Sequence, residues 1–374
     1  MSRGATTVLP GQTPTGDHVL SVLLKRSYAI RAGAACERAA EDQPLLGGDV
    51  FWDTPMNSSV RLESDLVPYK LETDLVIIAN AHAPAARPTH QFTAGVEVGG
   101  RRQLLLITGK RHASFTGEQS TPVFTEPELF TEAALRFEGA YGGTDVFSDL
   151  STVMPYPPNP RGRGFVVANH KPAVDGLALP NIEDPQNPLT PQRLCVGDYA
   201  RWNEQPAPAT LGWWPKNWHP RCLLAGVMPA DRATEQELRA AYAQLVPKEH
   251  RKAYVDNGLR DMDFAFFNGA PPGLRFPFGA LQPGAPVRTR NLVPEGALDF
   301  SLPADSPRIG IDIGQGLQWP QTVLHTVQIR LAERELDTVW RAALPYPGRD
   351  WLPQMKRLHI EVAEQNGSEA TAPA

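Results

Sequence analysis

Three histidines in the first third of the chain have side chains that could bind a metal. His82, His90 and His112 fall in one segment that predicts a sheet, and the carboxylate of Asp74 lies nearby in the sequence. Zinc in proteins is held by histidine, cysteine and carboxylate groups of this kind. Zinc sites usually also contain a closely spaced ligand pair, and these histidines offer none. We therefore favour loop or strand-end positions for them, and we expect no metal and no cofactor.

Two aspartates later in the chain could do acid–base chemistry. Asp261 and Asp263 alternate, and on a strand both would face one side, close enough to raise the pKa of one of them. In a turn, by contrast, aspartates accept hydrogen bonds from backbone N–H groups. We favour the turn, and we keep as the alternative function a hydrolase that uses Asp261 or Asp263 with a histidine.

The common catalytic signatures are missing from the sequence. It contains no G-x-S-x-G nucleophile elbow, no H-E-x-x-H and no G-x-G-x-x-G. Gly109-Lys110 resembles the end of a phosphate loop, but Leu104 stands where the first glycine of that loop should be. We therefore expect a protein that binds other molecules and is not an enzyme.

Four of the eight tryptophans fall in the short segment 202–218, which prolines interrupt. Tryptophan and arginine are enriched at interface hot spots, but a tryptophan also buries a large apolar area in a core. We favour the core for most of this cluster. As candidate partner-binding residues we nevertheless select the aromatic and arginine side chains of segments 137–165 and 202–221, namely Tyr141, Tyr156, Arg161, Arg163, Trp213, Trp214, Trp218 and Arg221.

The elements that must position these residues are short. The chain has 37 prolines, about twice the average usage, together with 31 glycines, and both are spread along the sequence. Proline interrupts helices and the interiors of strands. The composition therefore predicts a mainly β, β-sandwich-like fold of many short strands and long ordered loops, with one or two short helices.

Hydrophobic runs and alternating patterns give the positions of the strands. The most specific signal is Gln91–Val98, a Gly99-Gly100 turn and Gln103–Thr108, which together predict a hairpin. Thr234–Leu245 predicts the clearest helix, and a second, shorter helix could follow at Pro247–Val255. The remaining strands are expected at His18–Ile30, Val60–Leu71, Asp74–Ala83, Val287–Leu292, Ala297–Leu302, Arg308–Ile313, Thr322–Leu331, Asp337–Arg341 and Leu358–Val362.

Charge and cysteine content narrow the class of protein. A net charge of −5 argues against a nucleic-acid partner, and no apolar run is long enough to cross a membrane. Three scattered cysteines are typical of a reducing compartment, so we expect a cytoplasmic protein without a membrane partner. We expect a flexible arm at 1–17, a β-rich body at 18–362 and a disordered tail at 363–374. The body could be one unit or two interleaved modules, about 18–136 and 137–362.

Several loop motifs resemble, in the same order along the chain, those of a bacterial family known as domain of unknown function 2169. The resemblance covers about residues 45–345, with tyrosine for the usual phenylalanine at Tyr141 and valine for a usual threonine at Val227. Asp337–Arg341 follows the family pattern only in part. The matching segments are Thr73–Val76, Ala81–Pro84, Phe137–Gly143, Asn159–Phe165, Leu179–Glu183, Trp214–Arg221, Asp263–Pro271 and Asn291–Gly296.

The resemblance implies a function as well as a family. Such proteins look like adaptors or chaperones of type VI secretion, which bind a secreted toxic effector, a PAAR-type tip or the spike protein and load the effector onto the spike. It implies no catalytic residue. The hydrolase named above and a structural part of the injection machine are the alternatives.

Overall fold

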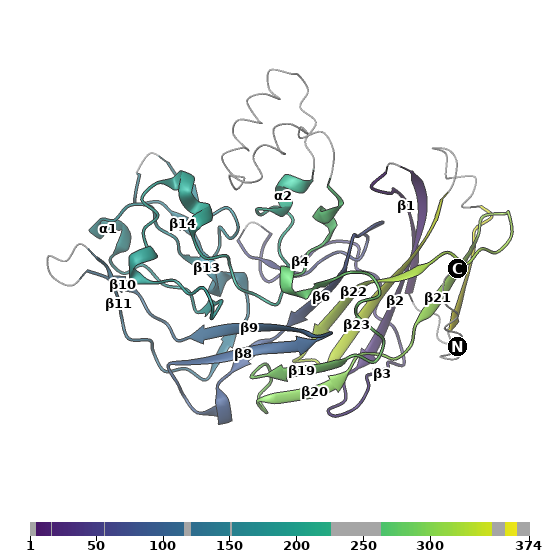
Figure 1. The fold of residues 1–374 in the computed structure, drawn as a ribbon, viewed down its shortest axis with the longest axis horizontal. Helices are drawn as coiled ribbons and strands as arrows, with labels where there is room; N and C mark the ends of the chain where they lie inside the picture. The colour runs from purple at the N-terminus through teal and green to yellow at the C-terminus, as the bar shows by residue number, and fades with distance from the viewer. Residues whose placement is uncertain are drawn as a thin grey trace, which may run out of the picture.

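The computed structural model describes residues 5–15, 17–55, 57–115, 121–149, 152–225, 263–345 and 356–364. Two large sheets and a lobe of short strands and loops make up this part of the chain (Figure 1). Within the described residues the helices are few and short: α1 (Lys171–Val174), α2 (Arg221–Leu224) and 3-10 helices of three to six residues. The prediction of a mainly β fold with few short helices is thus confirmed.

The larger sheet has seven strands within the described residues. Its order is β1-β2-β23-β22-β6-β18, and β3 pairs with the far end of β2. β6 and β22 run parallel, whereas the other neighbours are antiparallel. The strands are β1 (Ala5–Gln12), β2 (His18–Ala29), β3 (Glu37–Arg38), β6 (Thr73–Ile78), β18 (Arg275–Phe276), β22 (Thr322–Arg330) and β23 (Glu335–Pro345).

The smaller sheet has the strand order β17-β9-β8-β19-β20. Its centre is the predicted hairpin, in which Gly99 and Gly100 have φ values of 56° and 73°. Such positive values suit a two-residue hairpin turn, and glycine adopts them without strain. The strands are β8 (Gln91–Val98), β9 (Arg101–Thr108), β17 (Ile182–Glu183), β19 (Pro286–Arg290) and β20 (Ala297–Ser301).

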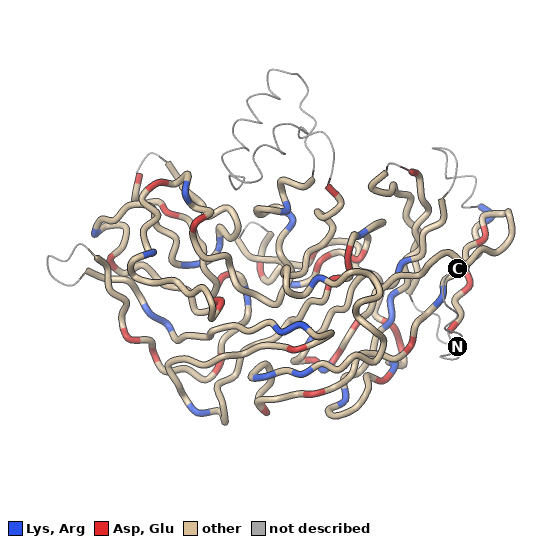
Figure 2. The backbone as a smooth tube through the Cα atoms, viewed as in Figure 1, with Lys and Arg blue, Asp and Glu red and all other residues tan. Residues whose placement is uncertain are grey.

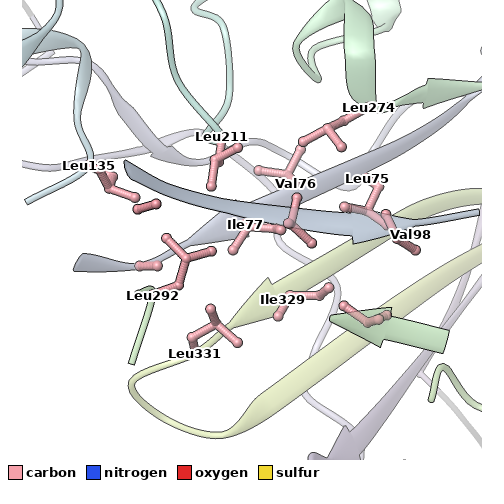
Figure 3. Packing of buried hydrophobic residues seen from close by; sticks show 14 of the residues in the cluster. Leu75, Val76, Ile77, Val98, Leu135, Leu211, Leu274, Leu292, Ile329 and Leu331 are labelled. Carbon is pink, nitrogen blue, oxygen red and sulfur yellow. The ribbon is translucent and has the colours of Figure 1, made fainter. Parts of the chain in front are cut away.

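An apolar core joins the two sheets. The alternation of β8 sends Phe92, Val96 and Val98 inward, and these side chains belong to the same buried cluster as Ile77 of β6 and Ile329 of β22. Figure 3 shows Val98 beside the β6 and β22 side chains of this core. Both sheets contain strands from before and after residue 137, so the sheets do not divide at the boundary between the two expected modules.

The two faces of the seven-stranded sheet differ in chemistry. On one face Leu24 of β2 pairs with Trp340 of β23, and a second apolar cluster joins them to the small sheet of β21 (Pro307–Asp312) and β24 (His359–Glu364). The opposite face carries polar side chains that are at most 8% exposed. Both faces are covered, which explains why β2 is buried along nearly its whole length. The polar face consists of Ser21, Lys25, Ser27, Asp74, Thr326, Gln328, Arg330, Asp337 and Arg341.

The proline- and glycine-rich segment after residue 137 forms a lobe with its own core, seen at the left of Figure 1. Tyr156 lies at the centre of this core, with its ring near those of Tyr141, Phe165 and Trp202. The small paired strands of the molecule are β4 (Val50–Phe51) with β5 (Val60–Leu62), β7 (Asn80–His82) with β12 (Glu132–Ala134), β10 (Ala113–Ser114) with β11 (Val123–Phe124), β13 (Tyr141–Gly142) with β16 (Arg163–Gly164), and β14 (Thr144–Asp145) with β15 (Met154–Pro155).

Several predicted boundaries differ from the structure. Ala5–Gln12 is strand β1 and not part of a loose arm, because it pairs along its length with β2. Only Val60–Leu62 of the expected strand at 60–71 is extended and paired, since the rest covers the polar face of the sheet. β24 reaches Glu364, inside the expected tail. The helices expected at 234–245 and 247–255 lie outside the described residues.

No helix in the described part of the chain is long and apolar enough to cross a membrane.

Candidate functional site

The two tyrosines selected from the sequence lie in the interior of the lobe. Tyr141 and Tyr156 are 1% and 2% exposed. The Tyr141 hydroxyl donates to Oε1 of Gln205 at 3.2 Å, and that of Tyr156 donates to the Pro206 carbonyl at 3.0 Å. Burial raises the pKa of both phenols. Contrary to the expectation, these side chains do not reach a surface on which a partner could contact them.

The tryptophans are buried as well. Trp213 donates its indole N–H to Oε1 of Gln328 at 3.1 Å, and Trp214 donates to the His219 carbonyl at 2.9 Å. Trp214 and Trp218 both pack against Phe137, with ring centroids 5.3 and 5.4 Å away. Because these rings fill the core below the loops, the core alternative is the one that the structure supports.

Arg221, chosen as a partner-binding residue, is only 1% exposed. Its guanidinium forms a two-pronged ion pair with Glu63, at 2.6 and 2.9 Å, and donates to the carbonyls of Phe266 and Trp214. This arginine is therefore a bridge between three segments and is not available to a partner. Of the eight selected residues, only Arg161, which is exposed, and Arg163, which is half-buried, reach the surface.

The histidines and aspartates with possible chemistry do not converge. Among the described residues no group of three His, Cys, Asp or Glu side chains is placed to hold a metal ion. His82 lies in β7, His90 directly precedes β8, and His112 directly precedes β10. Asp263 accepts a hydrogen bond from the Ala265 N–H at 2.8 Å, as expected for a turn, and Asp261 lies outside the described residues.

Asp74 is the centre of a buried polar network that the sequence did not reveal. Its carboxylate accepts hydrogen bonds from Nζ of Lys70 at 2.7 Å and from the backbone N–H groups of Gly269 and Ala270 at 3.0 and 3.2 Å. Burial alone would raise the pKa of Asp74, but Lys70 and these hydrogen bonds hold it below its ordinary value. Thr73–Val76 and Asp263–Pro271, two of the motifs that carry the resemblance, thus meet at this carboxylate.

Gly269 shows how closely this network is packed. A Cβ atom there would lie 2.7 Å from Trp213 and 2.8 Å from Arg221 and Glu63. The Arg221–Glu63 pair is therefore continuous with the network around Asp74. We call these residues, together with the polar face of the seven-stranded sheet, the covered polar layer. Residues of the segments 42–55, 57–71, 205–225 and 263–271 cover it and bond to it.

An open polar region of the described chain lies around the three-residue strand β12. Two clefts adjoin there and share the side chains of Glu132 and Arg136. The first, which we call the β12 cleft, has a volume of about 440 Å³ and lies between β12 and the end of β9. Its lining includes Lys110, Glu128, Leu129, Phe130, Glu132, Ala134, Arg136, Glu138, Arg163 and Asn181.

The second cleft, the Trp52 cleft, has a volume of about 590 Å³ and is bounded by β7 and the turn between β22 and β23. The guanidinium of Arg136 lies 3.8 Å from the centroid of the Trp52 ring, and that of Arg61 lies 5.2 Å from it. Cations near a tryptophan ring in this way are held by its electron-rich face. Trp52 thus fixes Arg136 in the wall between the clefts.

In the β12 cleft, two acidic side chains have hydrogen-bond partners, whereas the basic side chains lack partners of opposite charge among the described residues. Glu132 accepts a hydrogen bond from Asn80 at 2.5 Å, and Glu138 accepts from the N–H and hydroxyl of Ser59. Within the described part of the chain, Lys110, Arg136 and Arg163 form no ion pair with a carboxylate, and Arg163 donates instead to Oδ1 of Asn181 at 3.0 Å. Elsewhere basic and acidic residues are interspersed (Figure 2). The β12 cleft therefore has spare capacity for an acceptor.

The architecture is that of a mainly β protein in which two sheets share a core and a loop-rich lobe adjoins an open cleft. The chain belongs to a bacterial family described as "uncharacterized protein conserved in bacteria (DUF2169)", whose model matches residues 15–341. No curated protein and no solved structure matches the chain.

Proposed function

We propose that this protein is a cytoplasmic adaptor of a type VI secretion system. It binds a secreted toxic effector, or a PAAR-type tip region, and loads it onto the spike protein without catalysis. The observation that carries the proposal is the β12 cleft, an open groove whose cationic side chains lack carboxylate partners. The family membership, whose loop motifs resemble those of such adaptors, supports it.

The architecture suits this task. Rigid sheets hold ordered loops in place, and recognition in proteins is concentrated on such loops. The β12 cleft joins the end of β9, the Phe137–Gly139 turn and residues Arg163 and Asn181 of the lobe. A partner that enters it would contact three separate parts of the molecule at once.

A capture experiment tests the proposal. The tagged protein is recovered from its native host under reducing conditions, and co-purifying proteins are identified by mass spectrometry. We expect one dominant partner that is a toxin or a spike-tip protein. Recovery of the protein alone, from cells shown to produce the neighbouring toxin, would overturn the proposal.

The same preparation separates an adaptor from a structural component. A loading factor is absent from purified, assembled spike complexes, whereas a structural component remains in them. Finding the protein there in stoichiometric amounts would favour the structural alternative.

A further inference from the structure

Strand β12 has backbone hydrogen-bonding groups that no other part of the described chain uses. It pairs with β7 in an antiparallel register in which Ala133 faces Ala81. The flanking bonds, Ala83 N–H to Thr131 O and Leu135 N–H to Ala79 O, show that every second residue of this segment is bonded to its partner. Glu132 and Ala134 are the alternate residues, so their N–H and C=O groups point away from β7.

Those outward groups are mostly unpaired. The Ala134 carbonyl accepts the Arg136 N–H at 3.0 Å, but within the described residues the N–H groups of Glu132 and Ala134 and the carbonyl of Glu132 have no partner. Both residues line the β12 cleft. A strand edge with free donors and acceptors is a template to which another extended chain can add.

A second free edge, that of β1, is protected by its sequence. The outward-facing residues of β1 are Thr6, Val8, Pro10 and Gln12, because the bond from Thr13 N–H to Asp17 O places the odd-numbered residues in the ladder with β2. Pro10 removes the donor in the middle of this edge. β12 has no such interruption, which makes it the better template of the two.

The side chains around β12 indicate what the added chain carries. Leu129 is 60% exposed beside the cleft and offers an apolar contact. Arg136, held against Trp52 in the cleft wall, has no carboxylate within ion-pair distance among the described residues. A carboxylate on the incoming chain supplies the acceptor that arginine binds best.

We propose that the β12 cleft binds an extended segment of the partner protein as an added strand along β12. The segment forms backbone hydrogen bonds with Glu132 and Ala134 and places a carboxylate side chain against Arg136. This inference rests on the adaptor function and names the partner chemistry of that same site.

A matched pair of variants tests the backbone contact. Glu132→Pro removes the outward N–H, while Glu132→Ala removes the same side chain and keeps that donor. Both changes remove the same side-chain bond from Asn80 and leave the backbone bonds to β7 in place, and proline is tolerated where the N–H of an edge strand faces outward. We expect Glu132→Pro to weaken capture of the secretion partner about three- to tenfold relative to Glu132→Ala. Equal capture by both variants would overturn the inference while the adaptor function stands.

A direct probe works without the natural partner. A synthetic peptide of alternating valine and threonine with a central glutamate is added to protein labelled with [15N]alanine, and its glutamine counterpart is the control. We expect the Ala134 amide signal to shift and that of Ala133, already bonded to β7, to stay. Absence of a selective Ala134 shift at millimolar peptide would overturn the inference, even if capture from the host succeeds.

A second pair of variants serves if Glu132→Pro fails to fold. Arg136→Gln removes the charge that faces the carboxylate, and Arg288→Gln is the control, since Arg288 pairs with Glu97 on the exposed surface of another sheet. The expected result is about tenfold weaker binding of the glutamate peptide to Arg136→Gln only. Unchanged binding of the glutamate peptide to Arg136→Gln would show that Arg136 does not bind a carboxylate of the added strand.

Discussion

Arg221 and Arg136 carry the same guanidinium group but lie in opposite environments. Arg221, in the covered polar layer, bonds to the Glu63 carboxylate and to two carbonyls. Arg136, in the wall of the β12 cleft, contacts the Trp52 ring and has no carboxylate partner among the described residues. Residue type alone therefore does not mark a binding site. Arg136 is available to a partner because it lines an open cleft and the fold gives its charge no carboxylate among the described residues.

The largest effect on stability is expected at Arg221. Arg221→Ala removes the two-pronged partner of the buried Glu63 carboxylate and leaves only Lys216, at 3.4 Å, beside it; breaking a buried pair costs about 3–5 kcal/mol. Denaturant unfolding measures the loss. Arg288→Ala, in an exposed ion pair, is the control and should cost about 0–1 kcal/mol. A loss at Arg221 no larger than that of the control would contradict the structural role.

Replacing both partners sharpens this result. In the double variant Glu63→Leu with Arg221→Met, no charge is left uncompensated, and buried pairs exchanged for apolar residues often lose little stability. We expect the double variant to be more stable than Arg221→Ala in the same unfolding experiment. The single variants Glu63→Leu and Arg221→Met are measured beside it. If the loss of stability in the double variant equalled the sum of the two single losses, the residues would not act as a pair.

Asn159 should give the next largest effect. Its Nδ2 group donates to the carbonyls of Phe137 and Tyr141 at 2.7 and 3.0 Å in the interior of the lobe. Asn159→Ala leaves both carbonyls without this donor and should lower the free energy of unfolding by about 2–4 kcal/mol. Thermal melting of Asn159→Ala, beside a control variant at an exposed asparagine, Asn187→Ala, measures this loss. Melting midpoints that agree between the two variants would be against the interpretation.

His219 is expected to cause a smaller loss of stability, one that depends on pH. Burial lowers its pKa from 6.5 to about 4, so between these pH values the unfolded chain binds a proton that the folded chain does not. Each unit of acidification in this window should therefore lower the free energy of unfolding by about 1.4 kcal/mol through His219 alone. Unfolding curves between pH 7 and 4 measure the slope. His219→Gln should reduce it, and the exposed His359→Gln should not.

His325 acts in the same direction. Its Nε2 atom accepts the Lys70 N–H at 3.1 Å, and burial, with Lys70 and Arg341 nearby, holds its pKa well below 6.5. Protonation would remove that acceptor and add a third positive charge. A protein whose stability did not fall from pH 6.5 downward would contradict both histidine assignments.

The smallest effect on stability is expected in the cleft itself. Arg136→Ala removes a group that lacks a carboxylate partner among the described residues, so the free energy of unfolding should change by about 1 kcal/mol or less, mainly through the lost contact with Trp52. Denaturant unfolding of this variant beside Arg221→Ala tests the comparison directly. A loss as large as that of Arg221→Ala would place Arg136 among the structural residues.

The sequence allowed good prediction where one pattern dominated. The β8–β9 hairpin follows from alternation and the Gly99-Gly100 turn, β19 and β20 follow from alternation as well, and β22 follows from a longer run rich in β-branched and apolar residues. β1 was missed because an edge strand buries few side chains and so shows little pattern. The clefts were missed because β12 is the unremarkable tripeptide Glu-Ala-Ala, which becomes an edge only when β7 pairs with it.

The partner-binding residues were mostly misplaced for a related reason. Tryptophan, tyrosine and arginine are common both at interfaces and in cores that contain polar groups, so their types could not decide between the two. Exposure is a property of the assembled chain. Asp74 and Arg221 show this most clearly, because their partners come from segments far away in the sequence.

The position of β2 in the large sheet also has a consequence for synthesis. Its main partner, β23, is made roughly 300 residues later, and β22, the next strand in the sheet, shortly before that. At about 5–20 residues per second, the ribosome leaves β2 without its neighbour for about 15–60 s. The apolar strand must be shielded during that interval, and a chain cut short before Glu335 cannot complete the sheet at all.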